Sequence, residues 1–153
     1  MHVADLENVS GLPVIVVHQL SHAIAALRAA AASGCPIVLA SAPEAGIYAG
    51  PGWFGALVAA GRETVPTARF LAVLDCGEGT GAALAAIRAG IEAIIFTGRP
   101  DVAARLADIA GQHGVRFATT RPVTALDLGD SFFSDEEHLR QACAEIMPGP
   151  VQP

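Results

Sequence analysis

The stretch Phe70 to Ala89, FLAVLDCGEGTGAALAAIRA, decides the fold. A short apolar run, Phe70–Leu74, leads into a polar, glycine-rich loop, and an alanine-rich helical pattern begins near Thr80. An apolar strand, a glycine loop and a helix in that order predict one strand-to-helix unit of an α/β protein. In such folds, ligands and catalytic groups gather in the loops after the carboxyl ends of the strands. Asp75 and Cys76 stand at that position.

The same rhythm recurs along the whole chain. Apolar runs typical of strands buried on both faces lie at Pro13–Val17, Ile37–Ala40, Phe70–Leu74, Ala93–Phe96 and Val115–Ala118. Helices are expected at Ser21–Ala32, Trp53–Arg62, Thr80–Ala89, Pro100–His113 and Asp135–Ile146. Strands that alternate with helices predict a parallel sheet. We therefore expect an α/β fold with a five-stranded parallel sheet flanked by helices, either a truncated (β/α)8 barrel (a half-barrel) or a flavodoxin-like sheet.

Local signals place the helix ends. Ser21 is the expected N-cap of the first helix, and Gly34 is its expected stop. Pro100 suits a first helical position. Ser134, with Glu137 three residues later, forms a capping-box pattern for the last helix.

The composition narrows the class of protein. The chain has 153 residues, with 9 Lys+Arg against 15 Asp+Glu and a formal net charge of −6. This balance argues against a nucleic-acid partner. Every fixed side-chain cation is an arginine, because the sequence contains no lysine, and this bias is typical of a GC-rich bacterial genome. We expect one domain over residues 1–147 and a flexible tail at 148–153.

The sequence also argues against a membrane or secreted protein. No apolar run approaches the ~20 residues of a membrane span, and the acidic N-terminal segment is unlike a secretory signal. Three widely spaced cysteines, Cys35, Cys76 and Cys143, form no disulfide framework or metal knuckle. A reduced, cytoplasmic setting is therefore expected.

Three blocks of sequence carry a resemblance to a known family. They are Ser21–Val38, Ser41–Gly50 (SAPEAGIYAG), and Leu74–Gly77 (LDCG) with the following Ala85–Gly98 (AAIRAGIEAIIFTG). From Pro13 to about Gly114 the chain resembles the N-terminal half of the class II, metal-dependent fructose-bisphosphate and ketose-bisphosphate aldolases. The resemblance implies a barrel-related fold and a lyase- or isomerase-like activity on a sugar phosphate, if the chain is an enzyme.

The resemblance also implies roles for particular residues. Asp75 matches the family aspartate that transfers the proton during carbon–carbon bond cleavage, and Cys76 stands where the family has a zinc-binding histidine. A cysteine thiolate can also bind zinc. His18, near a family asparagine, and Thr97, in place of an acidic residue, depart from the pattern. The other zinc histidines and the phosphate loops of the family come from later strands, so we do not expect full aldol cleavage.

Two kinds of site are consistent with the residues at the strand ends. One is a divalent-metal site, with zinc the candidate, formed by His18, Asp75 and Cys76, with Glu44 as a further candidate ligand. Asp75 and His18 are also the candidate catalytic groups. The other is a site for a small anionic metabolite. Its candidate residues are Ser41, Gly77, Gly79, Thr97, Arg99 and Arg121. In the alternative interpretation, Cys76 is an inert core residue and the glycines only form a tight turn.

Three functional classes therefore stay open from the sequence. The chain is an aldolase-like protein that binds a phosphorylated or carbonyl metabolite with Asp75 as acid or base, a non-catalytic metabolite sensor, or a structural, partner-binding protein with a vestigial site. An unclosed barrel exposes sheet edges and an apolar face, which proteins normally cover. We therefore expect a homo-oligomer, most simply a dimer, with the segment after Thr120 as the cover.

Overall fold

The structure, a computed structural model, describes residues 9–148 and shows an α/β fold. The strands lie in one six-stranded sheet in the order β5-β4-β3-β2-β1-β6. The pairs β1–β6, β3–β4 and β4–β5 are parallel. The strands are β1 (Val14–Val17), β2 (Ile37–Ser41), β3 (Phe70–Asp75), β4 (Ala93–Ile95), β5 (Arg116–Ala118) and β6 (Leu126–Asp127). The predicted α/β class is confirmed. Apart from Pro148, the expected tail lies outside the described residues.

The sheet has six strands, one more than the five expected. The additional strand, β6, is two residues long and pairs Leu126 with Ile15 and Asp127 with Val16. A strand of two residues contains no apolar run, so the sequence pattern could not predict it. The first five strands are neighbours in their chain order. In a flavodoxin-like sheet the first strand would lie between the second and third, so the consecutive order agrees with the half-barrel alternative.

Six helices connect or follow these strands in the described residues. They are α1 (Leu20–Ser33), α2 (Ala45–Tyr48), α3 (Gly50–Thr64), α4 (Thr80–Arg88), α5 (Pro100–Gln112) and α6 (Glu136–Glu145). Within residues 9–148, none of them combines the length and the apolar character that crossing a membrane requires.

Two of the predicted helix caps are wrong. Gln19, not Ser21, is the N-cap residue of α1, and Ser21 lies inside the helix. The last helix is capped by Asp135, whose side chain accepts the N–H of His138 at 2.8 Å. The capping-box pattern at Ser134 therefore places the cap one residue too early. The predicted end of the first helix is correct. Gly34 is the C-cap residue of α1 and adopts the left-handed conformation, with φ +66°.

The chain separates into two compact units. Of the described residues, unit 1 comprises 9–39, 57–71 and 123–148, and unit 2 comprises 40–56 and 72–122. The boundaries fall inside β2, α3 and β3, so both units contain parts of the same elements. Each unit is described by itself below, and the single domain over residues 1–147 stays a prediction.

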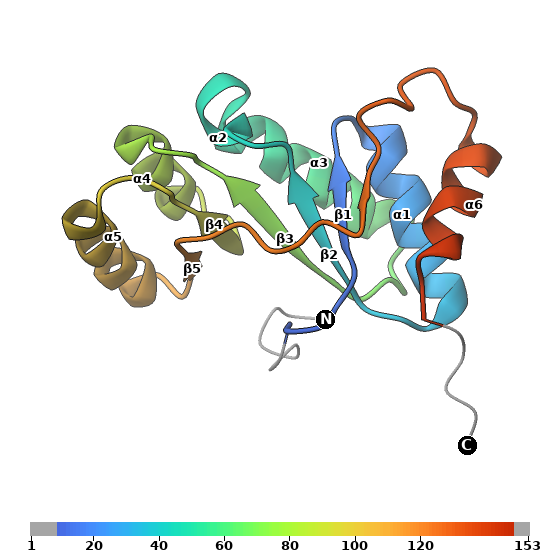
Figure 1. Cartoon of the computed structure of the whole chain (residues 1–153), viewed down its shortest axis with the longest axis horizontal. Helices are drawn as coiled ribbons and strands as arrows, with labels where there is room; N and C mark the ends of the chain where they lie inside the picture. The colour runs from blue at the N-terminus through green and yellow to red at the C-terminus, as the bar shows by residue number, and fades with distance from the viewer. Residues whose placement is uncertain (1–8, 149–153) are drawn as a thin grey trace. The chain divides into compact units, whose positions relative to one another are not determined.

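Unit 1 is built around β1 and the helix that follows it. All four residues of β1 are buried, and α1 buries a face of alanines with Leu27. Helix α6 lies along α1 (Figure 1), and it buries Leu139 and Cys143 in that contact. An ion pair between Arg28 and Glu136 joins the same two helices at the surface. The C-terminal helix is therefore an integral part of unit 1.

Unit 2 contains the glycine loop that the sequence singles out. Helix α4 follows this loop and packs on both α2 and α5. Every residue of β3 and β4 is buried, as is Phe96 directly after β4. Because β1 and β2 are buried as well, these four strands present no exposed apolar face in the single chain. The homo-dimer stays a prediction.

Gly46 of α2 should not tolerate a side chain. A Cβ atom there would lie 2.9 Å from Cys76 Sγ and 3.0 Å from the Asp75 carbonyl oxygen, and the backbone cannot easily move away. We expect Gly46→Ala to lower the free energy of unfolding by about 1–3 kcal/mol, the usual cost of overpacking. Urea unfolding followed by circular dichroism measures this change.

Gly81 of α4 supplies the matched control. A Cβ atom at Gly81 meets nothing within 4 Å, and alanine restricts the unfolded chain more than glycine does. Gly81→Ala should therefore raise the free energy of unfolding by roughly 0.4–1 kcal/mol. A Gly46→Ala protein as stable as the wild type would contradict the close packing of α2 on Asp75 and Cys76.

Candidate functional site

Asp75 ends β3 and is the buried centre of the candidate site in unit 2. Its side chain is only 3% exposed. One carboxylate oxygen, Oδ1, accepts the N–H of Gly77 at 2.7 Å and the N–H of Glu44 at 3.1 Å. The other, Oδ2, forms an ion pair with Arg121 Nη1 at 2.6 Å. Buried charges need this degree of pairing, because an uncompensated carboxylate is costly to desolvate.

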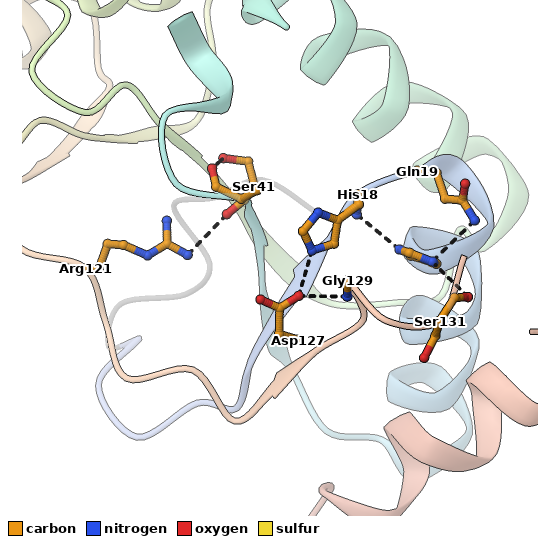
Figure 2. Close-up of polar contacts among 9 residues, drawn as sticks. His18, Gln19, Ser41, Arg121, Asp127, Gly129 and Ser131 are labelled. Carbon is orange, nitrogen blue, oxygen red and sulfur yellow. Dashed lines mark hydrogen bonds and ion pairs between the residues drawn. The ribbon is translucent and has the colours of Figure 1, made fainter. Parts of the chain in front are cut away.

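Arg121 reaches this carboxylate from the segment that follows β5. Its Nη2 also donates to the carbonyl oxygen of Ser41 at 3.3 Å, the contact drawn in Figure 2. The hydroxyl of Ser41, in turn, accepts the N–H of Asp75 at 2.9 Å and donates to the Ala42 carbonyl. The ends of β2 and β3 and the segment after β5 are thus joined by one network. The guanidinium side chain stays a quarter exposed.

The loops around Asp75 are held in unusual backbone conformations. Glu44, which precedes α2, has φ +63°, and Gly77 has φ +53°. A left-handed conformation is unfavourable for a residue with a side chain, and the bond from the Glu44 N–H to Asp75 stabilises it there. A Cβ atom on Gly77 would lie 2.8 Å from Glu44 Cγ. The conformations of the Glu44 loop and the glycine loop therefore depend on the Asp75 carboxylate and on the absence of a side chain at Gly77.

The structure places the other predicted anion-binding residues of unit 2 in two groups. Thr97 is tied to the glycine loop, because its N–H donates to the Gly77 carbonyl at 2.8 Å. Gly79 is the N-cap residue of α4 and provides no side-chain cap. Arg99, in contrast, is exposed and pairs with Asp101 at 2.9 Å. The roles of all these residues in binding stay predictions.

Cys76 lies in the core of unit 2, next to Asp75. It is fully buried. Burial, and secondarily the negative charge of Asp75, raises the pKa of its thiol to about 12. Zinc binds the thiolate, and this environment opposes the formation of one. Among residues 9–148, no group of three or more His, Cys, Asp and Glu side chains is arranged to hold a metal ion. The residues present therefore do not fit the zinc site that the aldolase resemblance implies.

His18, the other candidate catalytic residue, directly follows β1 in unit 1. Its Nε2 lies 2.6 Å from Asp127 Oδ1, and the same oxygen accepts the N–H of Gly129 at 2.8 Å (Figure 2). The His18 side chain is 20% exposed. A carboxylate only accepts hydrogen bonds, so the His18 Nε2 carries a proton. Whether His18 acts together with Asp75 stays a prediction.

His22 supports His18 from inside α1. It is fully buried, and its Nδ1 accepts the backbone N–H of His18 at 3.2 Å. A backbone N–H can only donate, so the ring proton of the neutral His22 lies on Nε2, 3.3 Å from the Ser131 carbonyl oxygen. Gln19 Nε2 approaches the same ring nitrogen to 3.3 Å and donates instead to the Phe132 carbonyl at 3.1 Å.

The sequence analysis did not single out Asp127, Gly129 or His22. A signal for the first two exists, because Leu126–Gly129 reads LDLG and Leu74–Gly77 reads LDCG. In both turns the aspartate Oδ1 accepts the N–H of the glycine two residues later, at 2.8 Å and 2.7 Å. The repeated Leu-Asp-x-Gly pattern could therefore have located both aspartates. His22 gave no such signal, because its burial and its contact with the Ser131 carbonyl, 109 residues away, leave no local pattern in the sequence.

Comparisons with known proteins bear on the fold. No protein-family model matches the chain, and no curated protein sequence matches it. Among solved structures, a protein of Coccidioides immitis assigned as a fructose-1,6-biphosphate aldolase is similar over 69% of this chain and 39% of its own, with 17% identity and a TM-score of 0.58. A protein of Sinorhizobium meliloti 1021 assigned as a tagatose 6-phosphate kinase is similar over 88% of this chain and 44% of its own, with 19% identity and a TM-score of 0.54.

These likenesses concern the fold alone, because sequence identity is below a fifth in both. They confirm the resemblance to the aldolase fold that the sequence blocks indicate. The chain spans less than half the length of each of the two structures. Their activities therefore do not pass to this chain with the fold.

The buried thiol of Cys76 should resist alkylation. With a pKa of about 12, only roughly one thiol in 10,000 is ionised near pH 8. We expect iodoacetamide to leave Cys76 unmodified in the native protein and to modify it readily in urea, as measured by peptide mass spectrometry. The partly exposed Cys35 is the internal control for access of the reagent. Rapid native labelling of Cys76 would contradict the burial that the structure shows.

The buried ring of His22 should make unit 1 sensitive to acid. Burial lowers its pKa most, His18 lowers it further, and the Ser131 carbonyl and Asp127 oppose the shift. A histidine whose folded pKa is lowered contributes stability above its unfolded pKa of about 6.5, and that contribution is lost as the pH falls through the folded pKa.

Paired variants isolate the contribution of His22. Urea unfolding of the wild type and His22→Gln, at about pH 7.5 and pH 5, should show the stability advantage of the wild type shrinking in acid. His138→Gln, at an exposed position of α6, is the control and should leave the pH dependence unchanged. An advantage of equal size at both pH values would refute a titrating role for His22.

Proposed function

We propose that this chain binds a small phosphorylated or carbonyl metabolite at the carboxyl ends of β2 and β3 in unit 2, with Arg121 as the contact for its anionic group. One observation carries the proposal. The guanidinium is held at 2.6 Å by the buried carboxylate of Asp75 and at 3.3 Å by the Ser41 carbonyl, yet a quarter of the side chain is exposed.

This arrangement prepares Arg121 to bind an anion. An arginine has more N–H donors than these two contacts use, and a planar guanidinium matches a phosphate or carboxylate in bidentate geometry. A side chain that is already fixed loses less conformational entropy when the ligand arrives. Asp75 neutralises the charge of Arg121, so we expect directed hydrogen bonds, rather than net charge, to supply the affinity.

The loop before α4 adds a second contact for an anion. Gly79 leaves the helix without a side-chain cap, and the first turn carries no acidic residue. Free backbone N–H groups at such a helix end favour a negative ligand. Glu78, exposed in the same loop, opposes an anion electrostatically. The proposed affinity therefore depends on Arg121.

The names of the two similar structures favour a phosphorylated sugar as the ligand class, since one is assigned as an aldolase of a sugar phosphate and the other as a kinase named for one. Binding, rather than acid–base catalysis by Asp75, is the function we propose. Both oxygens of Asp75 already accept hydrogen bonds from Gly77, Glu44 and Arg121. Three of its roughly four lone-pair positions are therefore occupied, which favours a role in holding Arg121 over one in proton transfer.

Thermal unfolding with and without ligand tests this proposal. Inorganic phosphate, dihydroxyacetone phosphate and fructose 1,6-bisphosphate are added to the wild type, with fructose as the uncharged control. A ligand at about 100 times its Kd stabilises the native state by about 2.7 kcal/mol. We expect a concentration-dependent rise in Tm with the phosphorylated compounds and none with fructose.

Two arginine variants make the test specific. Arg121→Gln removes the guanidinium, and we expect the Kd to rise about tenfold or more, as for the loss of a hydrogen bond to a charged group. Arg105→Gln makes the same change in charge at an exposed side chain of α5 and should leave the ligand-induced shift intact. Each shift is measured against the same variant without ligand, so a change in basal stability does not interfere. An undiminished shift in Arg121→Gln would disprove the role of Arg121.

A further inference from the structure

The loop Gly129–Ser134 of unit 1 connects β6 to α6 and is fixed at both ends. At its start, the Leu128 N–H donates to the Val16 carbonyl at 3.1 Å. At its end, Asp135 caps α6. Between these points the loop is folded on itself by bonds from the Ser131 N–H to Leu128 and from the Ser134 N–H to Ser131. The loop is therefore one compact turn between two fixed ends.

The first turn of α1 holds this loop in place. Gln19 donates to the Phe132 carbonyl. The His22 Nε2–H points to the Ser131 carbonyl at 3.3 Å, a contact that Figure 2 draws at Ser131. Gln19 is the N-cap residue of α1, but its side chain does not cap the helix. Instead, the side-chain amide of Gln19 donates to the loop at the Phe132 carbonyl. Two single hydrogen bonds of ordinary length form a weak attachment.

The ring of Phe132 completes the attachment. Its centroid lies 5.7 Å from that of His18 and 5.3 Å from that of His22, within the range of favourable aromatic contacts. The next residue, Phe133, is fully exposed. Phe132 is itself 45% exposed, so the two adjacent phenylalanines differ mainly in that Phe132 also contacts both histidine rings.

The start of the loop lies directly against the His18–Asp127 pair. A Cβ atom on Gly129 would lie 3.0 Å from Asp127 Oδ1 and 3.1 Å from His18 Nε2. Only a glycine lets the backbone come so close, and its N–H donates to Asp127 from that position. Two residues of the loop therefore lie next to the pair. Gly129 donates to Asp127, and the Phe132 ring contacts the His18 ring.

We propose that the loop Gly129–Ser134 is a lid over the His18–Asp127 pair, and that the Phe132 ring, with Gln19 and His22, is its latch. Opening exposes the His18–Asp127 pair to a ligand. The site takes a small polar group such as a hydroxyl, which can both donate and accept and so can pair with the imidazole. The lid and this site lie in unit 1 and do not rest on the function proposed for unit 2.

Chemical modification of His18 tests the lid. Diethyl pyrocarbonate reacts with an accessible, unprotonated imidazole nitrogen, and peptide mass spectrometry gives the rate at each histidine. The experiment compares the wild type, Phe132→Ala and Phe133→Ala. Removing the Phe132 ring, which contacts both histidines, should raise the population of the open loop, and with it the rate at His18, by roughly 5–30-fold. Removing the Phe133 ring should not change the rate.

Each outcome bears on the proposal. Faster modification of His18 in Phe132→Ala, together with faster amide exchange in residues 129–134 and no such change in Phe133→Ala, supports a latched lid. Equal rates at His18 in all three proteins would overturn it. The wild type gives an independent result, should Phe132→Ala not fold. There, His18 must react more slowly than the exposed His138, and an equal rate would also overturn the proposal.

Discussion

The buried carboxylate of Asp75 is the constraint on which the rest of unit 2 depends. One oxygen binds two backbone N–H groups and the other binds a guanidinium, so a single side chain joins the loop before α2, the glycine loop and the segment after β5. Replacing such a pair by apolar groups is often tolerated, whereas removing one partner leaves a buried charge uncompensated. The loops of unit 2 are therefore coupled, because none of the three can leave Asp75 without a cost to the other two.

The architecture could be predicted because each part of it has a local cause. Apolar runs of four or five residues announce β1, β2 and β3, and glycines such as Gly34 stop the helices by adopting a left-handed conformation. The prediction was wrong where the cause is not local. Strand β6 consists of two residues that extend because β1 offers them a partner. No property of Leu126 and Asp127 alone distinguishes them from a loop.

The candidate site shows the same division between local and long-range causes. Asp75 could be predicted as a candidate, because it follows the apolar run Phe70–Leu74, and functional groups gather at the carboxyl ends of parallel strands. Its pairing with Arg121 joins residues 46 positions apart, and that of His18 with Asp127 joins residues 109 apart. No periodicity spans such distances. The neutral state of His22 is still harder to foresee, because it follows from a backbone N–H donor and from burial.

The two Leu-Asp-x-Gly turns have the same local hydrogen bond but hold different basic side chains. In each, the glycine N–H fixes the aspartate, and the aspartate holds a basic side chain at 2.6 Å. Where that side chain is Arg121, the charge is permanent and every free position is a donor, which suits an anion. Where it is His18, an imidazole donates to the aspartate, and a hydroxyl, which can both donate and accept, suits the ring. The sequence of the turn is nearly the same in both units, so the class of ligand that we propose for each depends on the distant residue that the aspartate holds.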